Sequence, residues 1–248
     1  MMRSMRACLV RVGVDQAFGG WNAPVDPRTN EFVYVSIPET SDQRPGLATP
    51  YELVRPALAR FAGARADAPP RAVQLPAELA RANMHLDPDF GALTYGDTER
   101  RGRGLADLGA GDLVVFYAGL RPVSPCPHAL VYALIGLYGI AEVVRVGTVP
   151  AARWNENAHT RRSDHRPTDV IVRADPRVSG RLRTCLPVGE FRDRAYRVTR
   201  EVLDAWGGLS CRDGYLQRSA VPPRILDPAR FLAWFERRRP QVVSANNL

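Results

Sequence analysis

Two short segments near the start of the chain alternate apolar and other residues, residues 7–14 and residues 31–37. A period of two residues is typical of a β-strand that buries one face. The connection between them contains the pair Gly19-Gly20, followed directly by Trp21 and Asn22. Adjacent glycines allow the backbone to approach a bound group closely. The pattern therefore predicts two strands joined by a long loop that can contact a ligand.

Longer apolar runs occupy the middle of the sequence, in residues 113–117, 130–138, 140–146 and 168–174. Apolar, β-branched and aromatic runs of this length, separated by turn residues, are typical of β-strands. Gly136 lies inside one of these runs and Gly139 lies between two of them, and both allow a bend or a close approach of a neighbour. We therefore expect the central strands of an antiparallel sheet or barrel here.

Helical patterns lie on either side of these runs. Residues 49–61 begin like a capping box, with proline at the first helical position. A second helix is expected over residues 196–206, before Gly207, and a third is expected after Asp227, with an apolar stripe on one face. Repeats and long linkers are lacking. The prediction is one α+β domain over residues 1–248, with its core at roughly 105–175 and a helical part at 190–240.

Composition narrows the class of protein. The chain has 248 residues, of which 45% are hydrophobic, enough for a substantial buried core. Apolar runs of about 18 residues, which a membrane span needs, are lacking, and the first residues do not read as a signal peptide. The four cysteines form no Cys-x-x-Cys pair. We expect a soluble cytoplasmic protein with free thiols and no membrane partner.

The basic residues are all arginine, since the sequence contains no lysine. Schiff-base enzymes of the pyridoxal kind and P-loop nucleotide-binding proteins are thereby excluded, because both need a lysine. Residues 1–150 contain 15 Arg and 15 acidic residues, so the whole excess of +8 lies in residues 151–248, with 19 Arg and 11 acidic residues. Guanidinium groups suit phosphate and stack on bases, so a nucleotide or DNA is the favoured partner. A basic surface without a specific ligand is the alternative.

A possible metal-binding pattern occurs at His85-Leu86-Asp87, which is followed by Pro88 and Asp89. An H-x-D pair with a distant histidine can hold non-haem iron or another divalent metal. His128, His159 and His165 are the available third ligands. A capped loop explains the same residues without a metal, so a divalent metal is the less favoured hypothesis.

The richest concentration of polar chemistry lies in residues 154–162, which form no periodic pattern. An aromatic side chain there can stack on a base, amides can read its edge, and guanidiniums can hold phosphate. A histidine with a carboxylate can transfer protons. The alternative is a polar loop anchored by a buried tryptophan. A weaker candidate near the end of the chain is the turn that presents Gln217 and Arg218.

Two resemblances add to this interpretation. Residues 111–117 and 133–144 look like the barrel core of the PUA-like group, which includes EVE and ASCH domains. More of the chain is similar to the third family of nucleotide-modification-associated domains. That likeness rests on Gly13-Val14-Asp15, on Gly19 to Pro24, on His85 to Phe90, on Leu93 to Asp97, on Phe116 to Leu120 and on residues 155–162.

The second resemblance implies a role in making or handling hypermodified DNA bases. Its motif positions in this chain are Asp15, Trp21, Asn22, His85, Asp87, Asp97, Tyr117, Asn157, His159 and Arg161. Together the residues and the resemblances predict a PUA-like mixed or antiparallel β-barrel core with flanking helices. We expect its pocket to bind a nucleotide or a flipped DNA base and to modify it. A non-catalytic reader of modified bases and a small-molecule enzyme of secondary metabolism are the alternatives, and the oligomeric state is left open.

The candidate residues fall into three groups. The catalytic candidates are Asp15, Asp97, Glu156 and His159. The nucleotide-binding candidates are Trp21, Asn22, Tyr117, Trp154, Asn155, Asn157, Arg161, Arg162, Gln217 and Arg218. The metal candidates are His85 and Asp87.

Overall fold

The computed structural model describes residues 4–65, 68–217 and 221–247 of the chain. Its strands are β1 (Ala7–Arg11), β2 (Pro24–Val25), β3 (Ala62–Arg65), β4 (Ala68–Ala72), β5 (Thr94–Asp97), β6 (Leu113–Pro122), β7 (Val131–Arg145), β8 (Val170–Ala174), β9 (Gly180–Pro187), β10 (Gly189–Arg192), β11 (Ala195–Val198), β12 (Arg224–Ile225) and β13 (Val242–Val243). The α-helices are α1 (Arg55–Ala59), α2 (Ala77–Ala80), α3 (Glu99–Ala106), α4 (Ala158–Arg161), α5 (Arg200–Trp206) and α6 (Pro228–Arg237). Short 3-10 helices are η1 (Tyr51–Val54), η2 (Val146–Thr148), η3 (Ala151–Glu156) and η4 (Arg212–Gly214).

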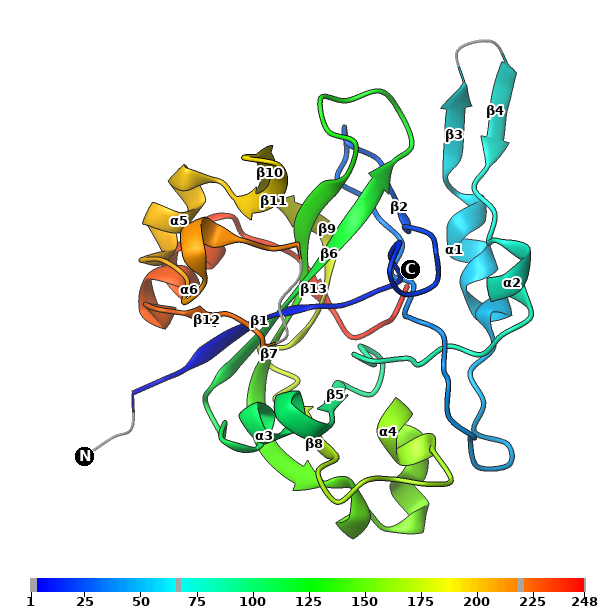
Figure 1. The fold of residues 1–248 in the computed structure, drawn as a ribbon, viewed down its shortest axis with the longest axis vertical. Coiled ribbons are helices and arrows are strands. Elements are labelled where there is room, and N and C mark those ends of the chain that lie inside the picture. Colours follow the sequence, from blue (N-terminus) through cyan, green and yellow to red (C-terminus); the bar gives the residue numbers. More distant parts are fainter. Residues whose placement is uncertain (1–3, 66–67, 218–220, 248) are drawn as a thin grey trace.

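One large mixed sheet dominates the fold (Figure 1), with its main strands in the order β12-β1-β6-β7-β8-β5. β1 and β2 run parallel to β6, whereas β7 pairs antiparallel with β6, β8 and β9. The predicted antiparallel centre is confirmed for β6, β7 and β8. In the described residues this path does not close on itself, so a barrel is not confirmed, and the PUA-like core over residues 105–175 stays a prediction. The sheet also includes β1, β5 and β9, which lie outside residues 105–175.

Both faces of the central strands are buried. Along β6, Val114 and Phe116 belong to one apolar cluster, whereas Val115 and Tyr117 belong to another. Helices α5 and α6 cover the second cluster, and residues of η1 and α1 cover the first. In Figure 1 these helix pairs lie on opposite sides of the long strands. The uninterrupted apolar runs in the sequence follow from this two-sided burial.

Gly136 allows the first apolar cluster to pack closely against β7. A Cβ atom at this position would lie 2.4 Å from Cε1 of Phe90. The ring of Phe90 is fully buried and makes edge contacts with Phe116 and Tyr138. The expected close approach at Gly136 is therefore confirmed, and it places the chain segment next to Asp87 and Asp89 against the sheet.

Three expectations about local structure need correction. Residues 31–37 are extended and mostly buried but form isolated bridges instead of a strand, because their backbone groups bond to scattered partners such as Val14 and His85. The helix expected over residues 49–61 is the short pair η1 and α1, and Thr49 makes no side-chain cap. The helix expected from residue 196 begins at Arg200, because residues 195–198 pair with β10 as a hairpin.

The last two helical signals are confirmed. Helix α5 ends at Trp206, directly before Gly207, and Asp227 caps α6 by accepting a hydrogen bond from the backbone N–H of Arg230. The apolar stripe of α6, Phe231, Trp234 and Phe235, is buried against α5. Within residues 4–65, 68–217 and 221–247, no helix is both long and apolar enough to cross a lipid bilayer.

The C-terminal segment returns to the centre of the molecule. The side chain of Asn246 accepts a hydrogen bond from the backbone N–H of Phe90 and donates one to Asp89. Asn247 makes a similar pair of bonds with the backbone of Tyr34. Four side chain bonds thus fasten residues 246–247 beside the segment that contains Asp87.

Arg181 in β9 is a charged residue that is buried in the protein interior. It is 1% exposed, and its Nε and Nη1 atoms have no hydrogen-bond partner among the described residues. Its guanidinium lies over the ring of Phe32. Burial lowers the pKa of Arg181 to about 10, so its positive charge opposes folding.

Replacing Arg181 by methionine should stabilise the protein, since it removes an unpaired buried charge and keeps the apolar stem. We expect the free energy of unfolding in urea to rise by about 1–3 kcal/mol. Arg183→Met is the matched control, because Arg183 lies on the same strand but is exposed. A loss of stability in Arg181→Met alone would mean that the guanidinium is satisfied within the native fold.

Candidate functional site

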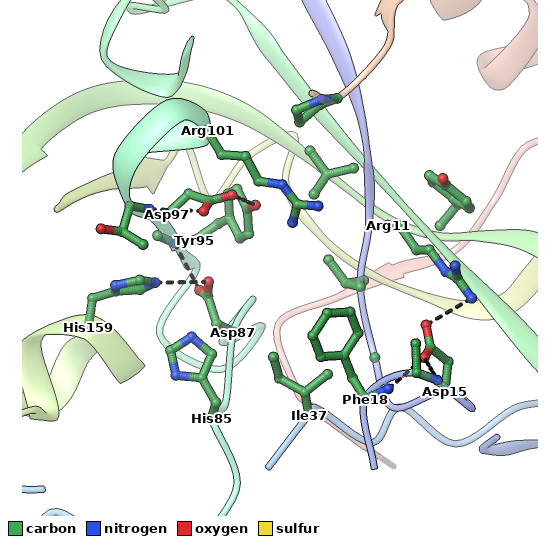
Figure 2. Close-up of a pocket in the computed structure, with 18 of the residues that line it drawn as sticks. Arg11, Asp15, Phe18, Ile37, His85, Asp87, Tyr95, Asp97, Arg101 and His159 are labelled. Atoms are coloured by element: carbon green, nitrogen blue, oxygen red, sulfur yellow. Dashed lines mark hydrogen bonds and ion pairs between the residues drawn. The ribbon is translucent and has the colours of Figure 1, made fainter. Parts of the chain in front are cut away.

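A cavity of about 630 Å³ opens beside β1. Its wall is formed by β1, the loop that follows it, residues 37–40, β5, the start of α3 and residues of α4. Figure 2 shows charged side chains from these separate elements directed into the same space. The titratable and cationic residues of the wall are Arg11, Asp15, His85, Asp87, Tyr95, Asp97, Arg101, Tyr117, His159 and Arg162.

The inner wall contains a compact cluster of His85, Asp87 and His159. One ligand atom from each of these residues lies within 4.8 Å of the other two. All three side chains are buried, with exposed fractions of 8%, 8% and 4%. Nε2 of His159 lies 3.8 Å from Oδ2 of Asp87, which is longer than a hydrogen bond. The three donors therefore face one another without direct hydrogen bonds between them.

His85 is oriented by a carboxylate outside the cavity wall. Its Nδ1 lies 2.7 Å from Oε2 of Glu39, and Arg162 forms an ion pair with the same carboxylate. Burial alone would raise the pKa of Glu39, but the contacts with His85 and Arg162 outweigh it and lower the pKa to about 2. An ionised Glu39 accepts a hydrogen bond from Nδ1–H of His85, so this contact fixes the orientation of the imidazole ring.

Asp87 and His159 are held by one amide, the side chain of Asn157. Its Oδ1 accepts the backbone N–H of His159 as the N-cap of α4, and its Nδ2 donates to Oδ1 of Asp87 at 2.8 Å. Oδ1 of Asp87 also accepts the backbone N–H of Gly96. Burial raises the pKa of Asp87 and lowers the pKa of His159, with smaller contributions from their neighbours. The arrangement leaves Oδ2 of Asp87 directed toward the imidazoles.

Gly96 in β5 makes room for this cluster. A Cβ atom there would lie 2.5 Å from Cδ2 of His159 and 2.9 Å from Oδ1 of Asn157. Because His159 is buried, neither neighbour can move aside easily. The glycine of the Thr94 to Asp97 motif thus fixes how closely β5 approaches α4.

Asp97 forms a second titratable group at the cavity wall. It accepts hydrogen bonds from the hydroxyl of Tyr95 and from the backbone N–H of Thr98. Burial raises the pKa of Asp97 above its ordinary value, although these hydrogen bonds and the charge of Arg101 oppose the shift. Figure 2 shows the Arg101 side chain extending from α3 toward the cavity. A carboxylate whose pKa is raised is a stronger base than an exposed carboxylate, so Asp97 is suited to proton transfer.

The loop after β1 forms the opposite rim. Asp15 accepts the backbone N–H groups of Ala17 and Phe18 and pairs with Arg11 at 2.8 Å. These contacts turn the chain so that the ring of Phe18 lies over the cavity, where it is 59% exposed (Figure 2). An exposed aromatic ring beside charged groups is a suitable surface for stacking.

A family model described as nucleotide modification associated domain 3 matches residues 6–205. The chain belongs to this family. The matched range includes the strands and loops that form the cavity, apart from Pro222 and Pro223 on its wall. No curated protein and no solved structure gives a significant match to the chain.

Several positions named from the family resemblance lie together in the cavity. These are Asp15, His85, Asp87, Asp97, Tyr117 and His159, and Arg162 joins them from the neighbouring segment. The hydroxyl of buried Tyr117 donates to the backbone oxygen of Leu216. Of the three histidines offered as a third metal ligand, the structure places His159 beside His85, whereas His128 and His165 are exposed elsewhere.

Other candidates lie outside the cavity wall and have structural partners. Glu156 pairs with Arg173 and Arg153. Arg161 is buried and bonds to Asp89 and to the backbone oxygen of Asn155. Their proposed roles with a ligand stay predictions, but both side chains contribute to the packing of η3 and α4.

The remaining aromatic and amide candidates are engaged in a similar way. Trp154 has Arg44 stacked over its ring at 3.6 Å, and Trp21 packs against the first apolar cluster. Asn22 is buried and donates to the backbone oxygen of Gly119. Asn155 is exposed, Gln217 bonds to the backbone N–H of Tyr196, and Arg218 lies outside the described residues.

Four residues that line or support the cavity were not among the candidates from the sequence. Arg11, Phe18 and Arg101 lie on its wall, and Glu39 orients His85. Phe18 could have been found, because an apolar aromatic directly before Gly19-Gly20 is poorly placed for the core. Glu39 follows a proline in an extended segment and gives no signal of its own. Its role depends on His85, which is 46 residues away along the chain.

Replacing Asn157 by alanine should destabilise the fold, because it removes an N-cap and a buried hydrogen bond to Asp87. We expect a loss of about 1–3 kcal/mol in the free energy of unfolding, measured by urea titration. Asn155→Ala is the matched control, since Asn155 is exposed two residues away and its side chain caps nothing. Equal stability of the two variants would contradict this role.

Proposed function

We propose that this protein is an enzyme that modifies a nucleotide or a nucleic-acid base held in the cavity beside β1. Membership of the nucleotide modification associated family supports the substrate class. The observation that carries the proposal is the composition of the cavity wall. It combines an exposed aromatic ring, three guanidinium groups and a buried set of histidine and aspartate side chains.

Recognition of the substrate is assigned to the rim. Phe18 offers a face on which a base can stack, and every base has a π-face. Arg11, Arg101 and Arg162 place guanidinium groups on the wall that suit phosphate oxygens. Arg11 also pairs with Asp15, and Arg162 also pairs with Glu39, so a phosphate would share these groups with the two carboxylates. A volume of about 630 Å³ lies within the usual range for pockets that bind small molecules and cofactors. Two of the three arginines come from the first 150 residues, so the net charge of the C-terminal part is not the source of this site.

Chemistry is assigned to the inner wall. Asp97 lies within the cavity, and its raised pKa suits a group that exchanges a proton with the substrate. His159 and Asp87 lie behind it. A protein that only reads a modified base needs stacking and hydrogen bonds. It gains nothing from burying His85, Asp87 and His159, because their desolvation costs free energy. This cost favours an enzyme over a reader.

Phe18→Ala should weaken binding of a mononucleotide by about 5- to 150-fold, which corresponds to loss of one stacking contact. Binding can be followed by calorimetric titration with each of the common nucleoside monophosphates and with short single-stranded DNA. The control is Phe191→Ala, because Phe191 is 60% exposed and does not line the cavity. If both variants bind as the unmodified protein does, or if no nucleotide or DNA binds at all, the proposed substrate class is wrong.

Asp97→Asn should leave nucleotide binding within a few-fold and abolish modification. Modification can be detected by incubating DNA and nucleotides with the protein in cell extract and analysing the digested nucleosides by mass spectrometry. If Asp97 acts as the base, the rate should rise as the pH rises through its raised pKa, because the ionised form accepts the proton. A protein that binds nucleotides but leaves every nucleoside mass unchanged would instead be a reader.

A further inference from the structure

We propose that His85, Asp87 and His159 bind one divalent transition-metal ion at the inner wall of the cavity. The proposed function does not require a metal, so this inference goes beyond it. Two imidazoles and one carboxylate form a donor set that holds catalytic iron or zinc in many enzymes. In the described part of this chain, the three residues come from two distant segments, the loop before β5 and helix α4.

The ligand atoms of these three residues converge on one point without forming hydrogen bonds to one another. The three ligand atoms lie within 4.8 Å of one another, and each of the three residues is at least nine-tenths buried. Yet the one close polar approach among them, between His159 and Asp87, is 3.8 Å. Buried polar groups normally satisfy one another through hydrogen bonds. Donors that face a common point without doing so are arranged for a shared partner.

Two of the three ligands, His85 and Asp87, are oriented by hydrogen bonds from residues behind them. Metal-binding histidines usually donate their other ring N–H to a carboxylate, which fixes the tautomer and the ring orientation. Nδ1 of His85 meets this pattern, since it lies 2.7 Å from Glu39. Nδ1 of His159 has no hydrogen-bond partner among the described residues, and the carboxylate nearest to it in an ion-pair geometry, Asp169, lies 3.9 Å away. Oδ1 of Asp87 is held by Asn157. The atoms left directed to the centre are the two Nε2 nitrogens and Oδ2 of Asp87.

The carboxylates around the cluster also favour a cation at its centre. Asp87, Glu39 and Asp169 place three carboxylates on and directly behind the cluster, with Asp97 nearby on β5. Arg162 pairs with Glu39 and is the cation in direct contact with this group, while Arg101 lies beside Asp97. A dication would balance these negative charges at the point where the three donors meet.

The donor set also limits which ion fits. Nitrogen and carboxylate ligands suit iron, zinc, cobalt and manganese, with bonds of about 2.0–2.2 Å. Such bonds require ligand atoms about 3–3.5 Å apart, so the side chains would close by about 1 Å around the ion. Three protein ligands leave further positions open, and the cavity that Phe18 and Asp97 line is where they would face. Water or substrate can bind there, which makes His159 a ligand and leaves Asp97 as the group that moves protons.

Metal titration of the full chain tests the proposal. The protein is treated with a chelator, dialysed, and titrated with Co²⁺, Zn²⁺, Mn²⁺ and, without oxygen, Fe²⁺. We expect one ion per chain with a Kd of micromolar or lower, and a rise in Tm as the ion is added. His85→Asn and His159→Asn should each weaken binding by at least about 100-fold, and Glu39→Gln by about 10-fold. His128→Ala, an exposed histidine outside the cluster, is the matched control and should bind normally.

A second measurement covers the case in which the ligand variants fail to fold. X-ray absorption spectroscopy of the unmodified protein loaded with Co²⁺ or Zn²⁺ should show two imidazole ligands and oxygen ligands at about 2.0–2.2 Å. The proposal is overturned if none of the four ions binds the folded protein at 100-fold molar excess. It is also overturned if folded His85→Asn and His159→Asn bind as tightly as His128→Ala, or if the spectrum lacks imidazole scattering.

These outcomes are separate from those that test the substrate. Metal titration contains no nucleotide, and nucleotide titration can be performed with the chelator present. Loss of metal binding with intact nucleotide binding would remove the metal and keep the proposed function. Metal binding without any affinity for nucleotides would support the metal site and contradict the proposed substrate class.

Discussion

One amide group, the side chain of Asn157, couples the two chain segments that carry the candidate chemistry. It caps α4 through the backbone N–H of His159 and donates to Asp87, which lies 70 residues earlier in the sequence. Its bonding capacity fixes both partners at once, since the oxygen is committed to the helix and the nitrogen to the carboxylate. The close approach of β5 at Gly96 completes the arrangement. The inner wall therefore depends on local capping as much as on the sheet.

Much of the sheet could be predicted from the sequence, for a physical reason. β6, β7 and β8 are buried on both faces and therefore read as continuous apolar runs. The pairing partners of these strands are harder to predict from the sequence. β1 pairs parallel with β6, about 100 residues away, and no periodicity encodes that choice. Residues 31–37 have a strand-like pattern because they are buried, but their hydrogen bonds go to scattered groups. Burial thus follows from the pattern, whereas pairing depends on the whole fold.

In the candidate site, likewise, the sequence indicated some of the residues but not their partners. His85, Asp87, Asp97 and His159 stood out by residue type, and the structure brings them to one cavity. The dense polar segment at residues 154–162 suggested a ligand-binding segment that would be poor material for the core. Much of it is buried instead, because its charges find partners within the fold, such as Arg161 with Asp89 and Glu156 with Arg173. Composition alone cannot separate a charge that awaits a ligand from one that is neutralised by a distant residue.

The bonds of residues 246–247 have a consequence for biosynthesis. Asn246 holds the backbone of Phe90 and the carboxylate of Asp89, two residues after Asp87, and Asn247 holds Tyr34. A ribosome makes these asparagines long after the segments that they fasten. Until they emerge, the loop with Asp87 lacks part of its anchoring, so the cavity lacks these four bonds while the residues before Asn246 are being made. The final form of the site thus depends on a segment that is synthesised about 150 residues after the loop it fastens.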